Sequence, residues 1–237
     1  MAQKKLFRFA QIKNFRNVLE YPQDMQGRWH SFFNNSNRII LELACGRGEY
    51  TVGLARLYPQ KNYIGVDVKG NRMYIGAKTA IDEHLLNVGF LRTQIEMLDK
   101  YFTRGEVDEI WITFPDPQLR ASKAKKRLTH PRFLQLYHNI LKPGGSIHLK
   151  TDSPQLYNFT LTVIRLYGCS LQVNNEDVYA QNDIPPELKI TTHYEKMDIA
   201  RSRRIHYIQF SLPKGGLPPS DEALKQWIDE EAAGRRE

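Results

Sequence analysis

The sequence predicts an α/β protein, with a mostly parallel sheet of seven strands, helices on both of its faces and an antiparallel hairpin at one edge. Short apolar runs alternate with helical stretches between residues 38 and 167, and this alternation is typical of a parallel sheet. Several runs stop at glycine or proline, where a strand meets a turn. Two late apolar runs follow each other without a full helix between them, which indicates the antiparallel edge.

The expected elements follow the chain in order. The first strand, 39–43, is apolar apart from Glu42 and stops at a turn that contains two glycines, Cys45-Gly46-Arg47-Gly48. The other expected strands cover 63–68, 88–91, 107–114, 146–151, 170–178 and 204–212. The expected helices cover 49–58, 70–84, 131–141 and 154–167.

These elements form a predicted main domain over 38–212. Residues 1–37 are basic and aromatic-rich without a clean period, so we expect a basic N-terminal arm. Residues 213–237 begin as a linker rich in proline and glycine and continue as a short helix, with Ser220 as its N-cap and Leu224 and Trp227 on one face.

The chain carries a net charge of +8 and has a pI near 9.4, which favours polyanionic partners such as nucleic acids. No apolar run approaches the roughly 18 residues of a membrane span, and the N-terminus lacks the apolar stretch of a signal peptide. The two cysteines, Cys45 and Cys169, show no disulfide or metal-site spacing. We therefore expect a cytoplasmic protein without a metal or a membrane contact, either a monomer or a homodimer.

Ligands of an open α/β sheet bind at the carboxyl ends of its strands. Gly46 and Gly48 follow the first strand and let a ligand approach the backbone closely. Asp67 ends the second strand, 21 positions after Gly46, where a carboxylate can accept hydrogen bonds from ribose hydroxyls. Glu42 is costly to bury in an apolar strand without a partner, which favours a functional role for it.

A nicotinamide dinucleotide is the competing ligand. Its G-x-G-x-x-G fingerprint requires a third glycine where this chain has Thr51. Its pyrophosphate binds at a helix N-terminus, where Glu49 places a negative charge. A ligand with an adenine, a ribose and a positively charged amino-acid tail fits these residues better.

A second candidate site follows the strand over 107–114. Phe114-Pro115-Asp116-Pro117 holds one carboxylate between two prolines, which fix φ and remove two backbone donors. Five cationic residues come directly after it within eight positions: Arg120, Lys123, Lys125, Lys126 and Arg127. Because this run follows the carboxyl end of a strand, we expect it to hold phosphates beside Asp116.

Two families of motif are visible in these segments. The segments 42–48 and 65–67 resemble the first two motifs of Rossmann-like class I S-adenosylmethionine-dependent methyltransferases. Five further segments resemble, in order, the bacterial tRNA (guanine-N7-)-methyltransferase family: 114–117, 126–134, 141–145, 150–152 and 192–195. The chain departs from the family pattern at Ala44, Gln94 and Gln118, where glycine, an acidic residue and tryptophan are usual.

The resemblance implies a methyltransferase domain over 38–212 that uses S-adenosylmethionine to methylate guanine N7 in tRNA, at the variable-loop guanosine 46. It implies that the cofactor-binding residues are Glu42, Gly46, Gly48, Asp67, Gln94 and Asp116, with Asp116 also catalytic. The implied substrate-binding residues are Arg120, Asp152, Thr192, His193, Tyr194 and Glu195. The implied RNA contacts are Lys123, Lys125, Lys126 and Arg127.

The chemistry of guanine agrees with these residue types. Guanine N7 carries a lone pair and no proton, so its attack on a sulfonium methyl needs no general base. The protein has to align the two reactants and favour the positive charge that moves to the purine. Asp116 suits that role, and Asp152 and Glu195 suit acceptance of hydrogen bonds from the guanine N1–H and amine.

Three other functions stay open at this point. A methyltransferase for another substrate class would not need the basic run. A noncatalytic RNA-binding protein on the same fold would show salt-dependent RNA affinity and no methyl transfer. A nicotinamide-dependent oxidoreductase is disfavoured by Thr51 and Glu49.

Overall fold

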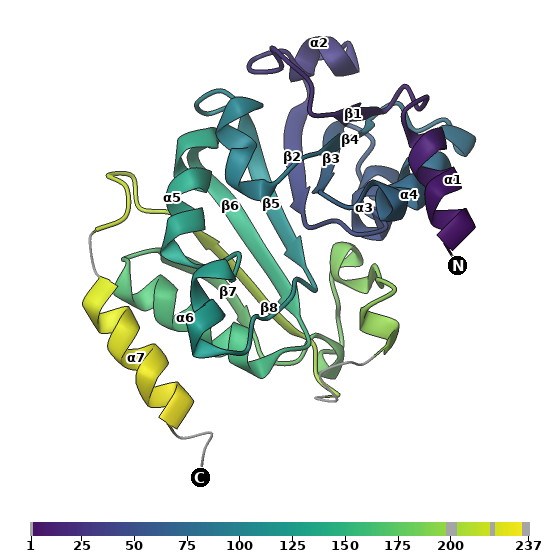
Figure 1. Ribbon diagram of the computed structural model, residues 1–237. Coiled ribbons are helices and arrows are strands. Elements are labelled where there is room, and N and C mark those ends of the chain that lie inside the picture. Colours follow the sequence, from purple (N-terminus) through teal and green to yellow (C-terminus); the bar gives the residue numbers. More distant parts are fainter. Residues whose placement is uncertain (1, 198–202, 219–220, 234–237) are drawn as a thin grey trace.

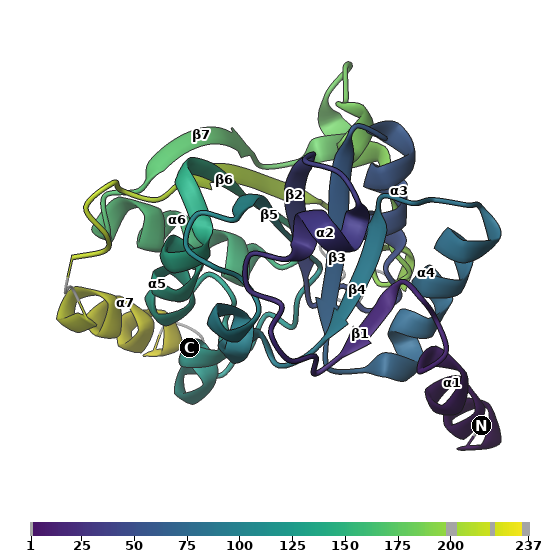
Figure 2. The same cartoon turned by 90° about the horizontal axis from the view of Figure 1, so that it is seen from above.

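An eight-stranded sheet runs through the centre of the molecule, a computed structural model that describes residues 2–197, 203–218 and 221–233 (Figure 1, Figure 2). The strands are β1 (Val18–Glu20), β2 (Arg38–Leu43), β3 (Lys61–Asp67), β4 (Val88–Arg92), β5 (Val107–Thr113), β6 (Leu141–Thr151), β7 (Ser170–Asn175) and β8 (His206–Ser211). They lie in the order β1-β4-β3-β2-β5-β6-β8-β7. The chain order reverses between β2 and β5, so the carboxyl ends of these neighbours border the crevice where open α/β sheets bind ligands.

Strands β1 to β6 are parallel, whereas β8 is antiparallel to both β6 and β7. This confirms the mostly parallel sheet with an antiparallel edge. The predicted count of seven strands is wrong, because β1 adds an eighth beside β4. Backbone hydrogen bonds hold it there, from Phe90 N to Asn17 O at 2.8 Å and from Tyr21 N to Arg92 O at 3.1 Å. Three residues are too few to show a strand period, so the pairing with β4 alone reveals this strand.

Helices cover both faces of the sheet (Figure 2). One face carries α1 (Ala2–Ile12), α3 (Glu49–Leu57) and α4 (Gly70–Asp82). The other carries α2 (Trp29–Phe33), α5 (Pro131–Ile140) and α6 (Pro154–Leu166). The last helix, α7 (Asp221–Ala233), packs against α6, with the Trp227 ring 6.0 Å from that of Phe159. Ser220, the expected N-cap of α7, lies outside the described residues.

Helix α6 shows how local sequence sets these elements. The side chain of Ser153 accepts a hydrogen bond from the backbone N–H of Leu156 at 3.2 Å and so caps the helix. Pro154 occupies the first turn, where its missing N–H costs nothing. Leu156, Phe159 and Val163 are buried at helical spacing and pack on the sheet.

The central parallel strands are buried on both faces because helices flank them on both sides. On β2, Leu41 and Leu43 pack into the core under α5 and α6, whereas Ile40 packs into the core under α3 and α4. Such strands therefore show a continuous apolar run rather than an alternation. None of the described helices is long and apolar enough to cross a membrane.

Candidate active site

The turn after β2 has three residues in the left-handed backbone region: Ala44 (φ 57°), Gly46 (φ 56°) and Gly48 (φ 72°). Gly48 precedes α3, and a Cβ built on it would lie 2.6 Å from the Phe90 ring, so no larger residue fits. Ala44 adopts the same conformation with a Cβ, at a cost of about 1 kcal/mol. Ala44 and Gly46 both line a cavity beyond the turn, so a ligand there approaches the backbone closely.

Asp67, at the end of β3, connects the turn after β2 to the turn after β3. Its Oδ2 accepts a hydrogen bond from the backbone N–H of Gly46 at 2.9 Å, and its Oδ1 accepts from the backbone N–H of Lys69 at 2.8 Å. The carboxylate also lines the cavity. The structure thus brings together the glycine turn and the acidic residue predicted to accompany it.

Glu42 lies behind the cavity wall rather than on it. Its side chain is buried, and its carboxylate accepts hydrogen bonds from the Thr51 backbone at 2.7 Å, from the Thr51 hydroxyl, and from Thr113 Oγ1 at 2.7 Å. Burial raises the pKa of Glu42 to about 7, although these hydrogen bonds act in the opposite direction. Glu42 thereby ties β2 to the start of α3 and to the end of β5, on either side of the cavity.

The turn after β5 projects Asp116 into the same space. Phe114 (φ 47°) and Gln118 (φ 48°) both adopt the left-handed conformation around the two prolines. Asp116 is exposed, and its Oδ1 accepts a hydrogen bond from the Gln118 backbone at 3.0 Å. The backbone N–H of Phe114 donates to the Lys150 carbonyl on β6 at 2.9 Å, which fixes the start of the turn.

A cavity of about 690 Å³ lies where the strand order reverses, and it is lined by the turn after β2, by Asp67 and by Asp116. Three carboxylates line it, those of Asp67, Asp116 and Asp152. Two cationic side chains, Lys69 and Arg72, and the apolar atoms of Phe114, Leu119 and Tyr194 complete much of the wall. Three carboxylates beside exposed backbone suit a ligand with hydroxyl groups and a positive charge.

Residues 36–207 match a family model described as "Putative methyltransferase". The chain is 49% identical over 213 residues to a tRNA (guanine-N(7)-)-methyltransferase of Porphyromonas gingivalis, covering 85% of this chain and 86% of that protein. It is 45% identical over 226 residues to a protein of the same name from Bacteroides thetaiotaomicron, covering 92% and 89%. The chain belongs to the tRNA (guanine-N(7)-)-methyltransferase family.

Solved structures of other methyltransferases share the fold of this methyltransferase. The 16S rRNA methyltransferase KamB superposes with a TM-score of 0.60 at 16% identity, over 83% of this chain and 99% of that one. A 30S ribosomal A1408 methyltransferase from an uncultured bacterium superposes with a TM-score of 0.58 at 16% identity, over 78% and 92%. The predicted class I methyltransferase fold is therefore confirmed.

The four residues Thr192–Glu195 of the methyltransferase do not all face the cavity. Tyr194 lines the cavity, with its ring close to Gly46 and 5.5 Å below the Arg72 guanidinium. Glu195 points elsewhere, with its side chain only 6% exposed and its carboxylate 3.0 Å from Lys150 Nζ. Thr192 is buried, and its Oγ1 accepts from the Glu195 backbone at 3.1 Å. His193 is half-buried and packs edge-on against Tyr194.

The basic run of the methyltransferase lies beside the cavity. It forms the 3-10 helix η2 (Ala121–Lys126), on which Lys123, Lys125 and Lys126 are exposed. Arg120 is exposed as well and shares a shallow groove with Asp116 and Lys123. Arg120 and Lys123 therefore lie beside Asp116, and Lys125 and Lys126 follow on the same short helix.

Arg127 does not lie on that surface, although it belongs to the same run of cationic residues. Its side chain is 1% exposed, lies 4.4 Å over the Phe159 ring and donates to the Gln118 carbonyl at 3.3 Å. Glu231 on α7 lies 4.0 Å from its guanidinium. The expectation that Arg127 contacts RNA is therefore wrong in this structure, because its charge is enclosed between η2, α6 and α7.

Two more predicted residues lie away from the cavity wall. Gln94 follows β4 and is exposed, but it is not among the residues that line the cavity. Gly48 lies one turn further back, packed on Phe90.

Sequence reasoning missed Lys69, Arg72 and Lys150. Lys69 and Arg72 begin α4 and line the cavity, yet nothing distinguishes them from other surface cations in the sequence. Lys150 carried a usable signal, because a lysine that ends an apolar run of a buried strand is as costly as Glu42.

Proposed function

We propose that this protein methylates N7 of guanine 46 in the variable loop of tRNA, with S-adenosylmethionine as the methyl donor. The observation that carries the proposal is the cavity itself, where the glycine turn, Asp67, Asp116 and Asp152 meet beside exposed lysines. The names of the relatives at 45–49% identity support tRNA and guanine N7 as the target. A tRNA substrate agrees with a cytoplasmic enzyme.

The residues of the cavity fit S-adenosylmethionine. The donor supplies an electrophilic methyl group on a positively charged sulfur. Three carboxylates against two cations leave the lining with an excess of negative charge, which favours a cationic ligand. Gly46 offers an approach without a side chain, and Asp67 offers a carboxylate for ribose hydroxyls. Glu42 and Gly48 support this wall from behind. Gln94 is exposed and outside the lining of the cavity, so the geometry gives no support to its predicted contact with the adenine amine.

In this proposal the protein contributes alignment and electrostatics rather than proton transfer. Guanine N7 has no proton, so no residue has to act as a base. Asp116 holds a negative charge at the rim between the cavity and the basic run, where it stabilises the positive charge that develops on the purine. Asp152, which also lines the cavity, accepts hydrogen bonds from the guanine N1–H and amine and so favours guanine over adenine.

The remaining predicted contacts are either with the guanine base or with the phosphates of the tRNA. Of the four residues Thr192–Glu195, Tyr194 lines the cavity and would contact the base, whereas Glu195 would act through its ion pair with Lys150. Arg120, Lys123, Lys125 and Lys126 attract tRNA phosphates. Because the cavity lies below the rim, we expect the target nucleotide to leave its stack before it reacts.

The test uses two unmodified tRNA transcripts that differ only at position 46, one with guanosine and one with adenosine. Each is incubated with the protein and methyl-labelled S-adenosylmethionine, and the nucleosides are separated. We expect labelled 7-methylguanosine from the first transcript alone. No label despite measurable cofactor binding would favour an RNA-binding protein without this activity, and label in both transcripts would reject position 46.

A further inference from the structure

Lys150 is a fully buried lysine near the end of β6, two positions before the cavity residue Asp152. Its ammonium donates to the carbonyls of Leu188 and Ile190, each at 2.9 Å, and pairs with Glu195 at 3.0 Å. An ammonium has three N–H donors, so these three acceptors satisfy it. All three belong to one segment, residues 186–197, which we name the strap.

The same residue also contacts the reaction turn. Its backbone carbonyl accepts the N–H of Phe114 at 2.9 Å, where the turn with Asp116 begins. Its ammonium lies 5.6 Å from the centre of the Phe114 ring and 5.5 Å from that of Tyr50 on α3. Lys150 is therefore the point at which β6, the Asp116 turn and the strap meet.

We propose that Lys150 is a positioning residue for the reaction: its side chain fixes residues 188–195 of the strap against the turn that carries Asp116. The inference rests on the proposed function and adds to it a residue that contacts neither reactant. Tyr194 depends on this anchor, because it stands next to Glu195 and reaches the cavity beside Gly46. If the strap moved, the cavity would lose its Tyr194 wall.

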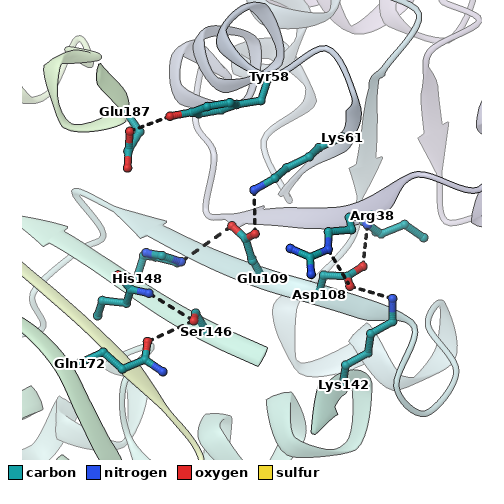
Figure 3. A network of polar contacts seen from close by, with 12 residues as sticks. Arg38, Tyr58, Lys61, Asp108, Glu109, Lys142, Ser146, His148, Gln172 and Glu187 are labelled. Atoms are coloured by element: carbon teal, nitrogen blue, oxygen red, sulfur yellow. Dashed lines mark hydrogen bonds and ion pairs between the residues drawn. The ribbon is translucent and has the colours of Figure 1, made fainter. Parts of the chain in front are cut away.

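The first part of the strap has anchors of its own. Tyr58 Oη donates to Glu187 Oε2 at 2.8 Å, as Figure 3 shows, and Tyr50 Oη donates to the Glu187 carbonyl. Ile190 packs on Gly53, where a Cβ would lie 2.9 Å from its side chain. The second part, from Thr192 to Glu195, is held by the ion pair with Lys150, by a hydrogen bond from Tyr179 to the Glu195 carboxylate and by the contact of Tyr194 with Arg72. Loss of Lys150 should therefore release the second part while the first stays attached.

Hydrogen exchange measures this release without any substrate. In the Lys150→Met protein we expect faster amide exchange over 192–197, by roughly tenfold or more, and little change over 49–57. Tyr179→Phe removes one bond to Glu195 from a side chain that is 45% exposed, so it should fold normally and accelerate exchange in the same segment to a smaller degree. Equal exchange in wild type and both variants would overturn the proposal.

Lys142→Met is the matched control. Lys142 lies at the other end of the same strand and pairs with Asp108 at 2.7 Å, far from the strap (Figure 3). It should leave strap exchange unchanged. The double variant Lys150→Met/Glu195→Gln then separates positioning from stability, because it leaves no unpaired buried charge. We expect it to regain thermal stability relative to Lys150→Met while strap exchange stays fast; recovery of both would assign Lys150 a purely structural role.

Activity supplies the last readout. We expect Lys150→Met to lower kcat/KM for tRNA by roughly tenfold or more, as small misplacements in active sites do, and to change the cofactor Kd much less. Equal losses in both quantities would contradict a role in positioning. An inactive wild-type protein would reject the proposed function instead, whereas the exchange experiment would still report on the anchor.

Discussion

Asp67 Oδ2 accepts a hydrogen bond of 2.9 Å from the backbone N–H of Gly46, so one side chain holds together the turns that follow β2 and β3. Both turns border the same cavity. The residue proposed to bind the ribose therefore also shapes the backbone on which the cofactor would rest.

Asp67→Ala removes that bond, the bond to Lys69 and the carboxylate itself. We expect the cofactor Kd to rise roughly tenfold to a hundredfold, because hydrogen bonds to charged groups contribute about 1.5–3 kcal/mol each. Isothermal titration calorimetry with S-adenosylmethionine measures it. Asp82→Ala is the control, since that carboxylate pairs with Lys78 on the exposed face of α4. Unchanged affinity would remove Asp67 from the cofactor site.

Asp116→Asn keeps the size of the side chain and an oxygen that can accept from the Gln118 backbone, but removes the charge. We expect kcat to fall about a hundredfold or more, as when an electrostatic group of a transition state is removed, with the cofactor Kd within a few-fold of wild type. Single-turnover methylation of tRNA separates the two effects. Asp99→Asn, an exposed change elsewhere, is the control. A fully active Asp116→Asn protein would exclude the central role of Asp116.

The triple variant Lys123→Glu/Lys125→Glu/Lys126→Glu reverses the exposed charges of η2. We expect a higher KM for tRNA and an unchanged cofactor Kd, because these side chains neutralise phosphates. The dependence of tRNA affinity on salt should also become shallower, by a log–log slope of about 0.7–0.9 for each lost phosphate contact. A tRNA affinity equal to that of wild type at every salt concentration would place the RNA on another surface.

Arg127→Met should behave differently although it lies in the same run of charges. The buried guanidinium holds the Gln118 carbonyl and the Phe159 ring, so we expect the free energy of unfolding to fall by about 2–3 kcal/mol. Urea denaturation measures this loss. Below the unfolding transition, the KM for tRNA should rise less than in the triple variant. The reverse ranking would restore Arg127 as an RNA contact.

The raised pKa of Glu42 predicts that the stability of the protein depends on pH. Its pKa is raised to about 7 in the folded protein from 4.5, so the folded state holds the proton more tightly than the unfolded state. This contribution is fully present below pH 4.5 and is lost as the pH rises through 7, by about 3 kcal/mol in total. The unfolding free energy of wild type should thus decline relative to Glu42→Gln between pH 5 and pH 8. Parallel curves would indicate an ordinary pKa.

Local patterns were sufficient for much of the fold. The strands β2, β3 and β5 can be recognised in the sequence as apolar runs, because strands buried on both faces contain few polar residues. The turns that follow β2 and β5 were visible through their glycines and prolines, and the sheet order then brought Gly46, Asp67 and Asp116 to one cavity. The strand β1 was not visible, because three residues form a strand only when an edge is there to pair with them.

The sequence by itself determined which chemical groups stand at the ends of the strands, since that depends on short-range pattern and chain order. Tertiary structure alone decided where individual charges point. Arg127 and Lys126 are neighbours, yet one is enclosed by Phe159 and α7 and the other is exposed. Glu195 faces Lys150, 45 positions away, rather than the cavity that Tyr194 lines. A buried charge requires a partner, and that partner comes from a distant part of the chain that only folding brings near.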